Sequence, residues 1–157
     1  MCGDEPTVSA DSLPDYVEFC GVPACDAPLG LERLAPERRV TAGQLAELQD
    51  GHAPPLLLDV RPRVEFGICA LPNSVNIPFS ELTAESTRAE ALAQVQHALP
   101  DTVDRRVVVV CRRGNDSQLV VQQLLAELAE HPICESLADL VGGLTAWARH
   151  DPTFPVY

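Results

Sequence analysis

From Val40 onward, short apolar runs alternate with amphipathic segments. Leu56–Val60 follows two prolines and is apolar except for one aspartate, and Val107–Val110 consists of four β-branched residues in a row. Runs of this kind are typical of strands that are buried on both faces of a sheet. Two further short strands are expected at Ser74–Ile77 and Ile133–Leu137.

Helices are expected between these strands. Thr41–Gln44 and Thr87–Glu90 have the form of capping boxes, which mark helix starts. A third helix follows the polar turn after the valine run, and a short one covers Leu144–Arg149. Strands that alternate with helices predict an α/β fold with a mostly parallel central sheet and helices on both faces. The expected core-facing helix positions are Leu45, Leu48, Ala89, Leu92, Val95, Leu99, Leu119, Val120, Leu124, Leu125 and Leu128.

Residues 1–39 differ from the rest of the chain. They are rich in proline, hold three of the six cysteines and show no sustained hydrophobic period. This composition predicts a tail or interdomain linker over residues 1–39, with one short helical turn at Asp15–Cys20, and a domain over residues 40–157. Since no structural element leads into Met1, we expect the chain to be a piece of a longer protein.

Composition narrows the function classes. The net charge is −12, and all 11 basic residues are arginine. Such a surface repels phosphate backbones, so we expect basic protein partners and no direct binding of nucleic acid. No apolar run approaches the roughly 18 residues of a membrane span, and there is no signal-peptide segment. A cytoplasmic protein with reduced thiols and no membrane association is therefore expected, and no complete zinc motif lies within the chain.

One cysteine lies at a position where parallel sheets usually bind their ligands. Cys111 directly follows the valine strand, and ligands of parallel sheets bind at the carboxyl ends of strands. Loop N–H groups, the following helix N-terminus and two arginines would stabilise a thiolate or a persulfide there. Because most free cysteines act as small buried hydrophobes, the pattern alone leaves a structural role open. The loop after the cysteine consists of Arg112, Arg113, Gly114, Asn115, Asp116 and Ser117.

Three stretches together resemble the signatures of the rhodanese family. The first is Leu58–Arg61 followed by Leu71–Pro78, the second is Val107–Gly114, and the third is Val141–Trp147 with Phe154–Tyr157 closing the chain. The resemblance covers residues 40–157. It implies a rhodanese-like fold and a sulfurtransferase that carries sulfur as a persulfide on its loop cysteine.

Roles are also expected for single residues in and around the loop. Asp59 and Arg61 are expected to pair and to support the loop, and Trp147 is expected to pack in the core. The six residues from Cys111 to Asp116 match the rhodanese loop length, and thiosulfate-using rhodaneses usually carry Arg or Lys at the sixth position, where this chain has Asp116. An acidic group would repel a doubly charged donor or pair with a basic partner, but it could equally serve as a helix cap. Arg112 and Arg113 could be two ordinary exposed arginines in a turn. Because the chain has no lysine and a net charge of −12, we favour a functional role for this pair.

The loop and the N-terminal tail also resemble the two-domain adenylyltransferase–sulfurtransferases of molybdenum-cofactor synthesis and transfer-RNA thiolation. In that family an adenylating domain uses ATP and a structural zinc, and Cys2 matches one zinc ligand whose partners are absent from this chain. No cofactor is expected for the rhodanese domain itself. A disulfide between Cys20 and Cys25 is an open hypothesis.

The family's role is implied by the same resemblance. A cysteine desulfurase or similar donor would supply sulfur, and the adenylated C-terminal glycine of a ubiquitin-like carrier would accept it. Two alternatives are a non-catalytic docking module and a phosphatase or arsenate reductase. The phosphatases hold phosphate with an arginine that follows the cysteine loop, where this chain has Gln118, which disfavours that class.

Overall fold

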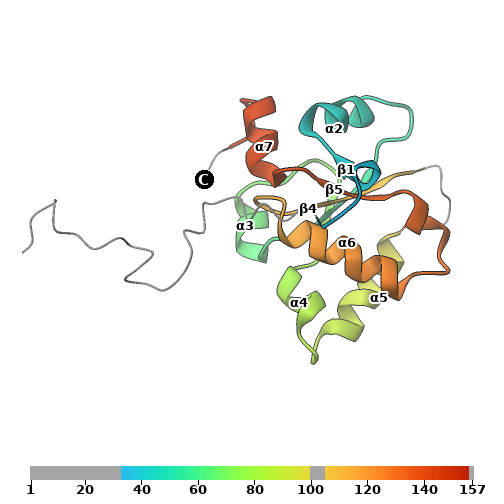
Figure 1. The fold of residues 1–157 in the computed structure, drawn as a ribbon. Helices are drawn as coiled ribbons and strands as arrows, with labels where there is room; N and C mark the ends of the chain where they lie inside the picture. Colours follow the sequence, from blue (N-terminus) through green and yellow to red (C-terminus); the bar gives the residue numbers. More distant parts are fainter. Residues whose placement is uncertain (1–32, 100–104, 156–157) are drawn as a thin grey trace, which may run out of the picture. The chain divides into compact units, whose positions relative to one another are not determined.

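The sheet is the centre of the fold. The computed structural model describes residues 33–99 and 105–155, which contain a five-stranded sheet of order β1-β5-β4-β2-β3 (Figure 1). Every neighbouring pair of these strands is parallel, which confirms the predicted α/β fold. The strands are β1 (Arg39–Val40), β2 (Leu56–Asp59), β3 (Ser74–Asn76), β4 (Val107–Val110) and β5 (Leu137–Leu140).

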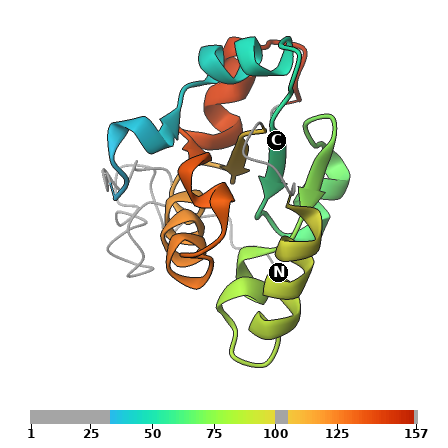
Figure 2. The same cartoon turned by 90° about the vertical axis from the view of Figure 1, so that its right-hand side faces the viewer.

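Helices cover both faces of this sheet, as predicted. Helices α2 and α7 lie side by side over one face, and α4, α5 and α6 lie over the other (Figures 1 and 2). The α-helices are α2 (Ala42–Gln49), α3 (Arg63–Ile68), α4 (Phe79–Thr83), α5 (Arg88–Ala98), α6 (Asp116–Glu127) and α7 (Gly143–His150), with 3-10 turns at Pro36–Arg38 and Pro132–Glu135. Among the described residues, none of these helices is long and apolar enough to cross a bilayer.

Alternation along the central strands divides the core into two clusters. Val109 and Cys111 point into the cluster under α4, α5 and α6, while Val108 and Val110 point into the cluster under α2 and α7. All four valines of β4 are fully buried. A strand buried on both faces reads as a continuous apolar run, which explains why β4 was recognisable from the sequence. Trp147 is buried in the second cluster, as expected.

The two predicted capping boxes have different outcomes. At α2 the box is formed: the Gln44 amide N–H donates to Thr41 Oγ1, and the Gln44 side chain accepts from the Thr41 N–H. At α5 the prediction is wrong, because the hydroxyl of Thr87 donates to the carbonyl of Glu81 and caps nothing. Ala89, predicted to face the core, is exposed there.

The last strand begins four residues later than predicted. The segment expected to be a strand, 133–137, is mostly the 3-10 turn that begins at Pro132, and β5 covers Leu137–Leu140 instead. Asp139 lies fully buried within β5 and pairs with Arg39 of the edge strand over 3.1 Å. A charged residue in a central strand concealed this element from the pattern analysis.

Some other features were not expected. Strand β1 and helices α3 and α4 are short and carry no clear hydrophobic period. Helix α6 ends at Glu127, before the end expected near His131. Leu34 is buried in the core, so the described end of the expected linker packs on the domain. The division between residues 39 and 40 stays a prediction, and the helical turn expected at 15–20 lies outside the described residues.

Candidate functional site

Cys111 lies directly after β4, the middle strand of the sheet, and only 2% of it is exposed. The backbone N–H of Gly114 donates to its sulfur over 3.0 Å, and the thiol donates to the hydroxyl of Ser117 over 3.4 Å. On ionisation the Ser117 hydroxyl can rotate and donate instead. Two donors around one sulfur suit a thiolate or a terminal persulfide anion.

Gly114 gives the loop its curvature. Its φ of +82° lies in the left-handed region, which is open to glycine and costly for other residues. A Cβ atom at this position would stand 2.6 Å from the backbone nitrogen of Gly142. Glycine is therefore required both for the turn and for the close approach of the segment before α7.

The start of α7 holds the cysteine loop from the other side. The Leu144 N–H donates to the carbonyl of Cys111 over 2.9 Å, and the Thr145 N–H and hydroxyl donate to the carbonyl of Arg112 over 3.0 and 2.9 Å. Gly143 has a φ of +58°, and a Cβ there would collide with the Cys111 carbonyl oxygen. Sequence analysis named this glycine pair only as part of a signature and missed its contact with the loop.

The remaining loop residues form the rim of the site. Arg112 and Asp116 are exposed, whereas Arg113 and Asn115 are half-buried. The hypothesis that Asp116 caps the helix is wrong: Asp116 is the first helical residue, Asn115 holds the cap position, and no side chain makes a cap hydrogen bond. The carboxylate of Asp116 is thus left at the rim.

The carboxyl group of Asp116 also has an unexpected neighbour. Partial burial raises the pKa of Asp116, and the negative charge of Glu65 in α3 raises it further. Glu65 carried no signal in the sequence, because nothing in the chain pattern places α3 near the loop. Negative charge at this position also disfavours an incoming anion.

Asp59 and Arg61 form the pair expected from the sequence. Both side chains are almost fully buried, and the Arg61 guanidinium donates to Asp59 over 2.6 Å and to the carbonyl of Cys69 over 2.7 Å. Asn76 donates to the carbonyls of Asp59 and Arg61, which ties the pair to β3. The Val60 N–H bonds the carbonyl of Val110, the residue before the cysteine, so the pair lies beside the base of the loop.

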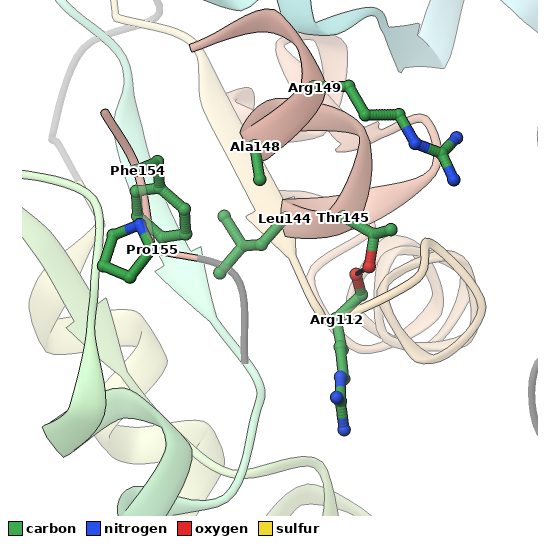
Figure 3. A pocket seen from close by; sticks show the side chains of 7 residues that line it. All are labelled: Arg112, Leu144, Thr145, Ala148, Arg149, Phe154 and Pro155. Atoms are coloured by element: carbon green, nitrogen blue, oxygen red, sulfur yellow. Dashed lines mark hydrogen bonds between the residues drawn. The ribbon is translucent and has the colours of Figure 1, made fainter. Parts of the chain in front are cut away.

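A pocket of about 200 Å³ opens next to Arg112. In Figure 3, Phe154 and Pro155 stand on one side of it and the face of α7 on the other, with Thr145 bonded to the Arg112 carbonyl. Its surface is mainly apolar. Arg112 and Arg149 also border it, but in Figure 3 their guanidinium groups point away from Phe154 and Pro155. The lining residues are Arg112, Leu144, Thr145, Ala148, Arg149, Phe154 and Pro155.

The other cysteines make no site in the described part of the chain. Cys69 and Cys134 are half-buried free thiols. Residues 33–99 and 105–155 contain no cluster of three or more His, Cys, Asp or Glu side chains that could hold a metal ion. Cys2, Cys20 and Cys25 lie outside the described residues, so the zinc ligand and the disulfide stay predictions.

Comparison with known proteins agrees with this geometry. The chain is 43% identical over 165 residues to the adenylyltransferase and sulfurtransferase MOCS3 of Mus musculus, and 39% identical over 158 residues to MOCS3 of Aedes aegypti. Both alignments cover 100% of this chain, but 35% and 34% of those proteins. The chain therefore spans about a third of the length of the curated relatives that it matches.

Solved structures show the same fold. The thiosulfate sulfurtransferase of Pseudomonas aeruginosa superposes with a TM-score of 0.57 and 25% identity, over 71% of this chain and 19% of that one. The profile of the rhodanese-like domain matches residues 41–150, which include the cysteine loop and the glycine pair that holds it. The chain therefore belongs to the rhodanese-like domain family.

Proposed function

We propose that this domain is a sulfurtransferase that carries sulfur as a persulfide on Cys111. The observation that supports this most is the Gly114 N–H aimed at the buried sulfur over 3.0 Å, at the carboxyl end of the middle strand. An amide donor and a hydroxyl stabilise the anionic forms of the sulfur through the whole cycle. The sulfur atom is the group transferred, and the domain needs no cofactor in this proposal.

Loading needs no external oxidant or reductant. The Cys111 thiolate attacks the terminal sulfur of a donor persulfide, a new S–S bond forms at Cys111, and the donor's S–S bond breaks. The donor cysteine leaves as a thiolate, so the electrons balance within the exchange. A cysteine desulfurase or a similar persulfide protein is the donor in this proposal. We place this transfer of sulfur to Cys111 in the cytosol, where glutathione and thioredoxin keep free thiols reduced.

The acceptor is the adenylated C-terminal glycine of a ubiquitin-like carrier. The terminal sulfur of Cys111 attacks the acyl carbon, AMP leaves, and the carrier is joined to Cys111 as an acyl disulfide. A thiol reductant then cleaves the S–S bond and releases the thiocarboxylate used for molybdopterin synthesis and tRNA 2-thiouridine. Adenylation requires ATP and a zinc-containing adenylating domain, consistent with relatives named adenylyltransferase and sulfurtransferase.

The rim and the pocket support a protein substrate over a small dianion. Asp116 and Glu65 place negative charge at the loop, which disfavours thiosulfate. The pocket beside Arg112 offers a mainly apolar surface, which suits the extended tail of a carrier protein. Arg112 and Arg113 would draw the acyl phosphate toward the sulfur.

A Cys111→Ser variant tests the proposal against the docking-module alternative. The chain is mixed with an adenylating enzyme, ATP, a ubiquitin-like carrier and a cysteine desulfurase, and thiocarboxylate is followed by mass spectrometry. We expect the variant to bind the carrier as the parent does but to form no thiocarboxylate. If the serine variant were as active as the parent, the persulfide proposal would fail and the domain would act by docking alone.

A further inference from the structure

Gln118 connects two parts of the molecule through a single buried amide. It lies in the first turn of α6 and is 3% exposed. Its Nε2 donates to the carbonyl of Gly114 over 2.6 Å, and its Oε1 accepts from the backbone N–H of Arg33 over 2.9 Å. A carbonyl can only accept and a backbone N–H can only donate, so these partners define which way the amide points.

The first contact acts on the residue that faces the sulfur. Gly114 uses its N–H to donate to Cys111 over 3.0 Å and its carbonyl to accept from Gln118. Glycine has the largest conformational freedom in the chain, so its N–H keeps a direction only when neighbouring groups hold it. Gly142 restricts Gly114 on one side, and the Gln118 amide restricts it on the other.

The second contact holds the Gln118 amide itself in place. Arg33 is bound twice by α6: its N–H by Gln118 and its carbonyl by the Gln122 side chain over 3.1 Å. The next residue, Leu34, is buried in the core. Because its Oε1 is bound to this anchored backbone, the Gln118 side chain cannot swing away from the loop without also losing the hydrogen bond to Arg33.

We propose that Gln118 is a positioning residue, which aims the Gly114 N–H at the sulfur of Cys111 and so stabilises its anionic forms. The proposal rests on the proposed role of Cys111 as the sulfur carrier. The amide supplies both a donor to the Gly114 carbonyl and an acceptor for the Arg33 N–H. Methionine has nearly the same shape but neither function, and glutamate keeps the acceptor but loses the donor when ionised.

The test measures alkylation of Cys111 by iodoacetamide as a function of pH, followed on the Cys111 peptide in the full 157-residue chain. Access to the sulfur sets the plateau rate at high pH, whereas stabilisation of the thiolate sets the midpoint. We expect Gln118→Met, which changes no charge, to raise the midpoint by about one pH unit, equivalent to a tenfold weaker thiolate stabilisation. A substitution that only changed access to the sulfur would alter the plateau and leave the midpoint in place.

Gln122→Met is the matched control. It removes a glutamine contact to the same Arg33 backbone from the same helix, one turn along, but it does not touch the loop. We expect its midpoint to stay at the parent value. An unchanged midpoint in Gln118→Met, or an equal rise in Gln122→Met, would overturn the proposal. The assay uses no sulfur donor. It therefore measures the effect of Gln118 on the Cys111 thiolate even if Cys111 accepts no sulfur.

Discussion

Leu144 donates its backbone N–H to the carbonyl oxygen of Cys111 over 2.9 Å. The contact joins the start of α7 to the end of β4, two segments that carry separate signatures in the sequence. It explains in physical terms why α7 begins with a glycine: a Cβ at Gly143 would collide with the carbonyl oxygen of Cys111, so only glycine allows the two backbones to approach so closely. The shape of the cysteine loop therefore depends on the C-terminal helix.

Replacing Gly143 by alanine tests this dependence. The added Cβ would collide with the Cys111 carbonyl, and the φ of +58° strains any other residue. We expect Gly143→Ala to lower the free energy of unfolding by about 2–4 kcal/mol and sulfur transfer at least tenfold. Urea unfolding and a sulfur-transfer assay measure the two effects.

Gly67→Ala is the control for that substitution. Gly67 lies in α3 and has open space around the position of a Cβ. Alanine there should leave transfer unchanged and raise stability slightly, by a fraction of a kcal/mol. Equal losses in both variants would show that the contact with the loop is unimportant.

The acidic rim predicts a change of donor preference. Asp116→Arg removes the carboxylate that would repel a dianion and adds a positive charge. We expect kcat/KM for thiosulfate to rise about tenfold relative to a protein persulfide donor, which corresponds to roughly 1.4 kcal/mol. Asp50→Arg makes the same change of net charge on an exposed residue at the end of α2. A similar rise in that control would assign the effect to overall charge.

The raised pKa of Asp116 also predicts how stability depends on pH. Burial and Glu65 make the folded state hold the proton more tightly than the unfolded chain does. The stability associated with the protonated form is present at low pH and is lost as pH rises through the folded pKa. We therefore expect Asp116→Asn to raise Tm by on the order of 1 °C at pH 7 and to lose this advantage in acid. Thermal unfolding of both proteins across pH measures this difference in Tm. A difference that grew on acidification would contradict the predicted pH dependence.

The Asp59–Arg61 pair predicts two very different costs for two similar substitutions. Arg61→Met leaves the Asp59 carboxylate buried without its guanidinium, and we expect a loss of about 3–5 kcal/mol in urea unfolding. Arg63→Met breaks an ion pair with Glu81 that lies at the surface, and we expect a change below about 1 kcal/mol. Comparable losses in the two variants would mean that burial does not decide the cost.

The parts of the fold that could be predicted are those with a local pattern. The valines of β4 and the capping box of α2 needed only neighbouring residues to identify them. Strand β5 was misplaced because its Asp139 is stabilised by Arg39, which lies 100 residues earlier in the chain. A pairing over that separation leaves no trace in a hydrophobic period.

For the site, too, the residues with a local sequence pattern could be predicted and the contacts between distant segments could not. Cys111 and its loop were identifiable because they follow a strand directly and resemble a known signature. The contacts of Leu144 and Gln118 with the loop, and the nearness of Glu65 to Asp116, depend on how distant segments pack. These contacts could be identified only from the structure.

The most direct test of the account is the mass of the Cys111 peptide after incubation with a cysteine desulfurase and cysteine. We predict a gain of one sulfur atom on this peptide, lost on reduction and absent in Cys111→Ala, with Cys69→Ser and Cys134→Ser loaded as fully as the parent. If Cys111 gains no sulfur from this donor or from thiosulfate, or if the alanine variant still loads, the persulfide account is contradicted.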